Sequence, residues 1–219
     1  KPHIMRMIIQ IGLPAGIQSC MFSLSNVVIQ SSVNSFGSIV IAGNAAGANV
    51  GNFVYQAMNT FQQAVTCFAG QNIGARKLDR VGPGLKAGGT FSVGLGIVFM
   101  MIYLPLANRI ISLFLPAGSA SGVVDVARGY LFTVVPFYVV VCIKFVCDSV
   151  LRGAGAMRPF MITTFSDLIL RVVLSIALFY VIGNEHGIWM SWPIGWFLGS
   201  GLSVFFYKTG AWRKDLPTL

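Results

Sequence analysis

The stretch TTFSDLILRVV, residues 163–173, indicates the fold class, because it places an aspartate and an arginine four positions apart inside an apolar run. That run extends over residues 159–182. A helix needs about 20 mostly apolar residues to cross roughly 30 Å of hydrocarbon, so the run is long enough to span a bilayer. A charge at mid-membrane costs about 2.5–3.5 kcal/mol on insertion scales, so we expect Asp167 and Arg171 to face the interior of a helix bundle. Their i, i+4 spacing lets them neutralise each other.

The depth of this pair leaves two interpretations open. At a helical rise of about 1.5 Å per residue from Arg158, Asp167 lies about 14 Å deep and Arg171 about 20 Å deep, near the bilayer midplane. The pair is either a structural anchor of this helix or an exchange site, in which Asp167 trades Arg171 for a proton, a sodium ion or a cationic substrate. A second pair, Lys144 and Asp148, is expected nearer the cytoplasmic interface, which the lysine would reach.

The rest of the composition agrees with a membrane protein. Of the 219 residues, 55% are hydrophobic and 10% are charged, and the mean hydropathy is +0.77. A soluble domain averages about 45–50% apolar and about 25% charged residues. The four cysteines show neither a zinc-site spacing nor a disulfide framework, so they are interpreted as small buried hydrophobes.

Six apolar segments of spanning length follow one another along the chain, so we predict an all-α membrane protein built as one six-transmembrane-helix lobe over residues 1–219. The segments are 8–34, 39–66, 84–106, 125–150, 159–182 and 187–207. Glycine-rich breaks at 82–84, 153–155 and 183–184 separate neighbours. Pro136 is expected to kink the fourth segment. The apolar connection that starts at Pro105 is expected to lie along the outer interface.

The distribution of basic residues predicts the orientation, because Lys and Arg accumulate in cytoplasmic loops. One side of the predicted bundle carries Lys1, Arg6, Arg76, Lys77, Arg80, Lys86, Arg152, Arg158, Lys208, Arg213 and Lys214. The other side carries Arg109 and Arg128. Both ends are therefore expected in the cytoplasm, and the net charge of +9 is interpreted as a topology signal rather than as a sign of nucleic-acid binding. A polyanion-binding patch at GARKLDR, residues 74–80, is the alternative.

Two rows of uncharged polar residues run along the first two segments. The second segment carries Asn49, Asn52, Gln56, Asn59 and Gln63, and the first carries Ser19, Ser23, Asn26, Gln30 and Asn34. Steps of three and four place each row on one helical face. An amide facing lipid costs several kcal/mol, so both rows are expected to face protein or water. Interhelical hydrogen bonds, worth about 0.6 kcal/mol each, are one reading, and the length of the rows favours the other, a wet cavity.

Small-residue motifs predict where helices approach closely. Gly43, Gly47 and Gly51 form a GxxxGxxxG run, and Gly195 with Gly199 repeats the spacing. We interpret both as packing seams. The chain opens with Lys1 rather than Met and shows no signal-peptide cleavage site, so we expect a piece of a longer protein without a signal peptide.

Three stretches, taken in order with the six segments, resemble the C-terminal half of a bacterial efflux protein of the multidrug and toxic compound extrusion (MATE) family. They are IGLPAGIQSCMFSLSNVVIQSSVNSFGS (11–38), AGQNIGARKLDRVG (69–82) and LRGAGAMRP (151–159). The resemblance implies a twelve-helix transporter of two lobes around a central cavity, placed in the bacterial cytoplasmic membrane. It also implies exchange of organic cations against sodium ions or protons, with a missing N-terminal lobe or second half as partner.

The resemblance is incomplete at the ion site. Sodium-coupled relatives are expected to carry an acid where this chain has residues 20–23, and a second acid near 140–143, and neither region contains one. The candidate coupling residues are therefore Asp167, Arg171, Asp148 and Lys144, and the candidate substrate-cavity residues are Asn26, Gln30, Asn49, Asn52, Gln56 and Asn59.

The leading hypothesis is half of a secondary antiporter, without a cofactor or bound metal beyond a transported sodium ion or proton. A lipid-linked oligosaccharide flippase of related architecture and a non-transporting membrane scaffold are the alternatives. An enzyme is not expected, because neither His3 nor His186 belongs to a nucleophile, metal or acid–base group.

Overall fold

In the part of the chain that the structure describes, six long helical segments are accompanied by short helical turns. The computed structural model describes the backbone of residues 2–116 and 120–214, and side chains there except at residues 2–4, 6, 7, 10, 11 and 214. Lys1 and the side chains of His3, Arg6 and Lys214 therefore lie outside the described residues. The elements are α1 (Pro2–Asn34), α2 (Ser38–Gly74), η1 (Leu78–Arg80), α3 (Val81–Tyr103), α4 (Ala107–Ser112), α5 (Ser121–Val134), η2 (Val135–Phe137), α6 (Tyr138–Gly153), α7 (Met157–Ile182), α8 (Glu185–Lys208) and α9 (Ala211–Lys214).

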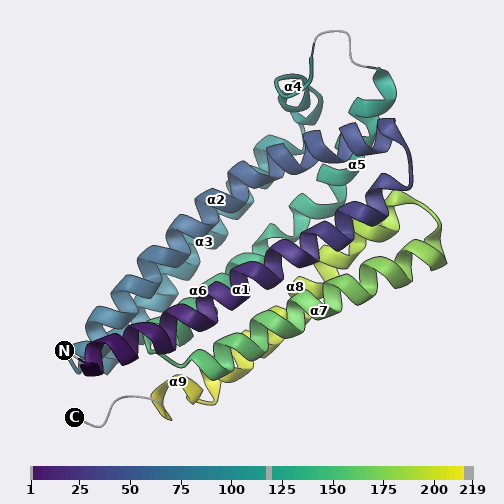
Figure 1. Cartoon of the computed structure of the whole chain (residues 1–219). Helices are drawn as coiled ribbons and strands as arrows, with labels where there is room; N and C mark the ends of the chain where they lie inside the picture. The colour runs from purple at the N-terminus through teal and green to yellow at the C-terminus, as the bar shows by residue number, and fades with distance from the viewer. Residues whose placement is uncertain (1, 117–119, 215–219) are drawn as a thin grey trace.

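The long helices run along one common direction, as Figure 1 shows. α2 packs on α3, α5 and α6, whereas α7 packs on α8 and α1, and α6 joins the two groups by packing on α8. α1 makes more contact with α7 than with α2, although α2 follows it directly in the chain. The start of α1 and the short α9 lie at the same end of the bundle, opposite α4 (Figure 1). An even number of long segments places the two ends of the described chain together, as the sequence predicts.

The helical extents agree closely with the predicted segments. α5, η2 and α6 together correspond to the fourth one, and Pro136, where a kink is expected, lies in the 3-10 turn between α5 and α6. Among the described residues, four segments are long and apolar enough to cross a membrane by length and composition: Gly12–Asn34, Leu78–Tyr103, Ser121–Gly153 and Met157–Ile182. α2 and α8 are not among these four segments. The amides of α2, and the tryptophans, glycines and serines of α8, lower the mean hydropathy of these two helices. That all six cross the bilayer as one lobe stays a prediction.

Glycines end two of the helices as predicted, but the third predicted break, at residues 82–84, does not lie between two helices. Gly155 and Gly183 adopt φ values of 72° and 71°, the left-handed region that favours glycine. The side chain of Asn184 then caps α8 by accepting a hydrogen bond from the Gly187 amide at 3.3 Å. The Gly-Pro-Gly at 82–84, in contrast, lies inside the first turn of α3 rather than before it. Proline is tolerated there because amides of the first turn have no intrahelical acceptor.

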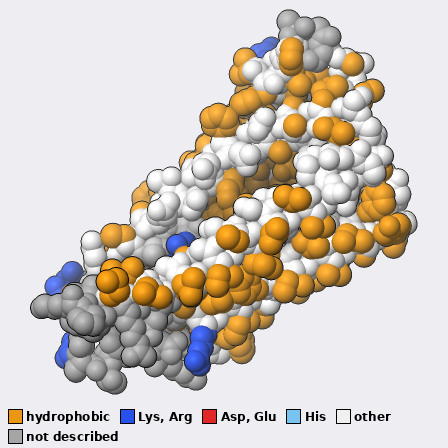
Figure 2. Space-filling model, in the orientation of Figure 1, with side chains coloured by type: hydrophobic (Ala, Val, Ile, Leu, Met, Phe, Trp, Pro, Cys, Tyr) orange, Lys and Arg blue, Asp and Glu red, His pale blue; other side chains and the backbone are white. Residues whose placement is uncertain are grey.

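The outer surface is apolar, as expected for a protein surrounded by lipid. Figure 2 shows hydrophobic side chains spread along the visible face, with Lys and Arg mainly at the end where α1 begins. Val181 is 80% exposed and Met101 is 69% exposed. Soluble monomers rarely expose contiguous apolar patches of this extent. The apolar surface therefore agrees with the membrane assignment from composition.

Both glycine motifs are packing seams, as predicted. A Cβ atom at Gly43 would lie 2.5 Å from Cβ of Val126 on α5, and one at Gly47 would lie 2.9 Å from the ring of Tyr130. In the second motif, a Cβ atom at Gly195 would lie 2.8 Å from Oδ1 of Asp167. The missing side chains thus let α2 approach α5 and let α8 approach α7.

One prediction about apolar residues is partly wrong, and another stays untested. Cys142 and Cys147 are buried as expected, but Cys20 and Cys67 are exposed, because they lie on faces of α1 and α2 that no other helix covers. In the connection after Pro105, Ile111 is fully buried against the core while Leu113 is 81% exposed, and the place of α4 along the outer interface stays a prediction. The short helix folds back on α5, which a linear sequence pattern does not reveal.

Candidate functional site

Two adjoining cavities open between α1 and α2, where Figure 2 shows the molecule hollowed. We call the first, of about 480 Å³, the aromatic chamber and the second, of about 430 Å³, the charged chamber. Both are lined by the same five side chains, which therefore form the boundary between them: Phe22, Tyr55, Gln56, Trp192 and Trp196.

Rings and amides line the aromatic chamber. Trp189, Trp192 and Trp196 follow one another at helical spacing on α8, and Tyr130 and Tyr138 face them from the segment around η2. No Asp, Glu, Lys or Arg is among the described residues of this lining. Trp189 is held in place by a hydrogen bond that its indole Nε1 donates to Oδ1 of Asn44 at 2.9 Å. The chamber suits a flat or apolar ligand held by ring faces and a few amide groups.

Most of the predicted cavity residues line the two chambers. Asn26, Gln30, Asn52 and Gln56 line the aromatic chamber, Asn59 lines the charged chamber, and Asn49 lies outside both. Ser19 and Ser23, the first two residues of the row on α1, line the charged chamber. That these side chains contact a substrate stays a prediction.

Hydrogen bonding within the two rows favours the hydrated interpretation over interhelical bonding. Nε2 of Gln30 donates to Oδ1 of Asn34 at 2.9 Å, and Nδ2 of Asn59 donates to Oε1 of Gln56 at 3.4 Å. Each pair lies on a single helix, so these bonds do not join α1 to α2. The remaining amide groups of Gln30, Asn52, Gln56 and Asn59 line the chambers, where water or a ligand can bond to them, whereas Oδ1 of Asn26 is buried without a partner.

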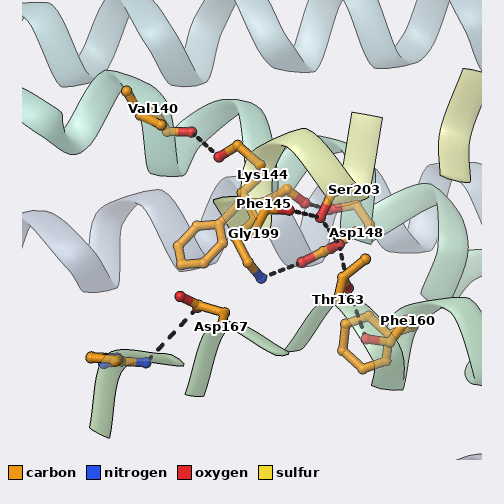
Figure 3. A network of polar contacts seen from close by, with 12 residues as sticks. Val140, Lys144, Phe145, Asp148, Phe160, Thr163, Asp167, Gly199 and Ser203 are labelled. Carbon is orange, nitrogen blue, oxygen red and sulfur yellow. Dashed lines mark hydrogen bonds and ion pairs between the residues drawn. The ribbon is translucent and has the colours of Figure 1, made fainter. Parts of the chain in front are cut away.

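Five charged side chains line the second chamber: Lys144, Asp148, Arg152, Asp167 and Arg171. Figure 3 shows Lys144, Thr163 and Ser203 converging on Asp148, with Asp167 apart from this group. Nζ of Lys144 donates to Oδ2 of Asp148 at 2.7 Å, and Oγ of Ser203 and Oγ1 of Thr163 donate to Oδ1 at 2.7 and 3.2 Å. Asp148 on α6 thus binds α7 and α8 together.

The expected reach of Lys144 to the cytoplasmic interface is wrong. Its side chain is 5% exposed, and it stays inside because Asp148 binds its ammonium group. Its stem also fills the space over Gly199, where an added Cβ atom would lie 2.8 Å from Cε of Lys144. Snorkelling would break the ion pair and leave Asp148 buried without its charge partner.

Asp167 and Arg171 form the predicted ion pair, but a loose one. Their closest atoms, Nη2 of Arg171 and Oδ2 of Asp167, are 3.9 Å apart, beyond hydrogen-bond distance. Oδ1 of Asp167 and Nε of Arg171 are both buried without a hydrogen-bond partner. A buried polar atom without a partner costs about 1–3 kcal/mol, so this pair has unused bonding capacity that Asp148 does not have.

The guanidinium group of Arg171 lies against two rings of the boundary between the chambers. Its Cζ atom is 4.5 Å from the ring centroid of Trp192 on α8 and 5.5 Å from that of Phe22 on α1. Both distances fall within the range of cation–π attraction. Arg171 therefore connects Asp167 in the charged chamber to the wall that the aromatic chamber shares.

A family model described as MatE matches residues 14–177. The chain belongs to the MatE family. Two curated relatives come from Bacillus subtilis (strain 168). The "Probable multidrug resistance protein YoeA" is 25% identical over 218 residues, which are 99% of this chain and 46% of that protein. The "Probable multidrug resistance protein YpnP" is 27% identical over 208 residues, which are 94% of this chain and 46% of that protein.

Solved MATE structures have the same fold. One, described as the outward-facing conformation of a multidrug resistance MATE family transporter of the MOP superfamily, has a TM-score of 0.85 at 19% identity and covers 97% of this chain and 48% of its own. A crystal structure of MATE in complex with MaL6 has a TM-score of 0.90 at 16% identity, with coverages of 98% and 49%. The chain is a multi-pass membrane protein that spans about half the length of the relatives it matches.

Sequence reasoning missed the aromatic side of this MatE site. The spacing of Trp189, Trp192 and Trp196 is that of one helical face, so a search for aromatic rows could have found it. No local pattern points to the stacking of Phe22 on Arg171, because these residues meet only when α1 packs on α7. Phe22 lies within the region where the resemblance leads us to expect an acid, and Val141, within the second such region, lines the charged chamber.

Proposed function

We propose that the chain is half of a secondary antiporter that exports organic cations or drugs in exchange for sodium ions or protons. Membership of the MatE family and two adjoining cavities between long apolar helices support this proposal. Asp167 is the exchange carboxylate, Arg171 its resting partner, and the Lys144–Asp148 pair a structural anchor. The amides and rings of the aromatic chamber hold the exported compound.

The contrast between the two buried carboxylates carries this assignment. Asp148 accepts bonds from three donors on three helices, so an added cation would have to displace groups that hold the fold. Asp167 has one ion-pair partner at 3.9 Å and one oxygen with no partner. Intramembrane acids with incomplete partners are typical of ion and proton paths.

The chamber next to Asp167 supports an organic cation as the exported compound. Cations bind the faces of Trp and Tyr rings with about 0.5–2 kcal/mol each, more when desolvated. Trp192 and Trp196 line both chambers, so a ligand against them lies next to the charged chamber. A sodium ion or a proton at Asp167 and an organic cation at these rings would then use neighbouring sites.

The two alternative functions have less support. A flippase for a lipid-linked pyrophosphate would need an excess of positive charge in the cavity, but two of the three cations of the charged chamber face acids, Lys144 with Asp148 and Arg171 with Asp167. A scaffold would not need two cavities lined by amides. The family consists of transporters, so an enzymatic role has no support in the MatE match.

The setting of the antiporter follows from the relatives and from the distribution of charge. Transport requires a second lobe, because the chain spans 46% of its curated relatives. The bilayer is that of the bacterial cytoplasmic membrane, with both termini on the cytoplasmic side according to the basic residues. No resident cofactor belongs to this function.

Competition between ions and an organic cation tests the proposal. We expect tetraphenylphosphonium to quench the tryptophan fluorescence of the purified chain in lipid nanodiscs, because three tryptophans line the aromatic chamber. Lowering the pH, or replacing potassium with sodium, should weaken this binding by about tenfold. The ion that competes identifies the coupling ion.

Asp167→Asn should abolish the competition, whereas Asp79→Asn, which removes an exposed carboxylate of η1, should leave it intact. Equal sensitivity to both ions in wild type and Asp167→Asn would contradict the assignment of Asp167. Absence of any competition in the wild type would contradict antiport at this site.

A further inference from the structure

We propose that Arg171 makes ion binding and substrate binding mutually exclusive. When a proton or sodium ion neutralises Asp167, the guanidinium charge at the boundary of the two chambers is no longer compensated and expels an organic cation. This inference rests on the proposed function, since it needs Asp167 as the exchanging carboxylate. It adds the residue through which the charge state of Asp167 acts on the exported compound.

The location of the guanidinium group is the first step. Phe22 and Trp192 belong to the linings of both chambers, and the guanidinium lies 5.5 and 4.5 Å from their ring centroids. Arg171 itself lines only the charged chamber and is 3% exposed. An organic cation against the opposite side of these rings would therefore face a fixed positive charge across the thickness of one side chain.

The charge balance around Arg171 is the second step. Asp148 is bonded to Lys144 at 2.7 Å, so the acid that compensates Arg171 is Asp167 at 3.9 Å. The described charged groups of the chamber comprise three cations, Lys144, Arg152 and Arg171, against two acids, Asp148 and Asp167. When Asp167 is neutralised, the chamber keeps its three cations but has only one charged acid. The titratable residue that α2 contributes near Arg171 is Tyr55. At the boundary between the chambers, α1 and α8 contribute uncharged rings and glycines.

The size of the effect is the third step. For unit charges about 5–8 Å apart at an effective dielectric constant of about 20, Coulomb's law predicts at least a tenfold change in binding. The sign depends on the charge of the ligand. A cation should bind more weakly when Asp167 is neutral, and an anion of the same shape should bind more tightly.

The side chain at 171 fits this role because a guanidinium is a delocalised, strongly basic cation. Its planar group also stacks on rings, which holds the charge at the wall instead of letting it leave with the solvent. A lysine would preserve the repulsion but lose much of the stacking.

A charge-reversal experiment with matched ligands tests the proposal. Tetraphenylphosphonium and tetraphenylborate have nearly the same shape and opposite charge. Their binding to the purified chain in lipid nanodiscs is measured by tryptophan quenching for the wild type, Asp167→Asn, Arg171→Gln and the double variant. We expect Asp167→Asn to weaken tetraphenylphosphonium binding at least tenfold and to strengthen tetraphenylborate binding. The double variant should return both affinities to within about threefold of wild type, because both charges are gone.

The outcomes separate this inference from the proposed function. If the double variant binds tetraphenylphosphonium as weakly as Asp167→Asn does, the carboxylate binds the cation directly; the role of Arg171 is then overturned and the role of Asp167 stands. If Asp167→Asn leaves the affinity unchanged, both are overturned.

A second variant keeps the test decisive if Arg171→Gln does not fold. Asp167→Asn combined with Arg171→Lys keeps a positive charge at the wall, so it should bind tetraphenylphosphonium as weakly as Asp167→Asn alone. Recovery of wild-type affinity in this lysine variant would overturn the proposal, because the recovery would not depend on removing the charge. Elution volume and tryptophan emission without ligand serve as the folding controls.

Discussion

Asp148 and Asp167 lie in the same chamber and have opposite surroundings. Asp148 is bonded to an ammonium and lies within hydrogen-bond distance of two hydroxyl groups, whereas Asp167 has a distant guanidinium and one oxygen without a partner. Both pairs have i, i+4 spacing, so the sequence makes them look alike. The difference arises from α7 and α8, which supply Thr163 and Ser203 to Asp148, whereas α8 presents the glycines at 195 and 199 to Asp167.

The first prediction concerns how much each of these two carboxylates contributes to the stability of the folded chain. Asp148→Asn should destabilise the chain by about 3–5 kcal/mol, because it leaves the buried ammonium of Lys144 without its counter-charge. Asp167→Asn should cost less, about 1–3 kcal/mol, because its ion pair is long and Arg171 keeps both ring contacts. Thermal unfolding in detergent, followed by tryptophan emission, compares the two variants. An Asp167→Asn variant that melts as early as Asp148→Asn would contradict the distinction.

At the scale of the elements, small residues decide how closely the helices approach. The Gly43, Gly47 and Gly51 face of α2 packs against α5, and Tyr138 at the start of α6 donates a hydrogen bond to the Gly51 carbonyl at 3.4 Å. Pro136 lies between these two contacts, in the 3-10 turn that separates α5 from α6. The seam and the break together place Tyr130 and Tyr138 in the wall of the aromatic chamber.

The second prediction tests the seam. Gly43→Ala should destabilise the chain by about 1–3 kcal/mol, because the added methyl group would overlap Val126 and the Val123 carbonyl. Gly94→Ala on α3 is the matched control, since nothing lies within 4 Å of its Cβ position. Alanine there should be neutral or stabilising by about 0.5–1 kcal/mol, owing to its higher helix propensity. Equal melting of the two variants would argue against close packing of α2 on α5.

At the scale of the whole molecule, the hollow between α1 and α2 separates a transporter from a scaffold. The two helices make few contacts with each other, and most of the predicted cavity residues line this space. A scaffold would close such a gap with side chains. The cavity is therefore the feature of the assembled bundle that transport most needs.

The third prediction is that water reaches this hollow. In a background with the exposed Cys20 and Cys67 replaced by alanine, cysteines at Asn52 and Gln56 should react with a charged maleimide at least about tenfold faster than one at Val54. Val54 is fully buried on the same helix, so it is the internal control. Reaction rates are measured by mass shift in membrane vesicles. Equal protection at all three positions would support a closed scaffold instead.

The fourth prediction concerns orientation. Lys77 lies in the basic connection before η1, and Leu113, which is 81% exposed, lies at the opposite end of the bundle. In intact cells, an impermeant thiol reagent should label Leu113→Cys, and in inverted vesicles it should label Lys77→Cys, because basic loops remain cytoplasmic. The reverse pattern would place both ends of the chain outside the cell.

The sequence by itself determined the membrane class, the helical segments and most of their breaks. These features depend on composition and on local patterns of apolar residues, glycine and proline, which act within a few turns of the chain. The tertiary structure alone decided that Lys144 stays inside the bundle, that Asn49 lies outside the cavity and that Arg171 stacks on Phe22 and Trp192. Each of these depends on which helices become neighbours, and residues such as Phe22 and Arg171 are too far apart in the chain for local periodicity to connect them.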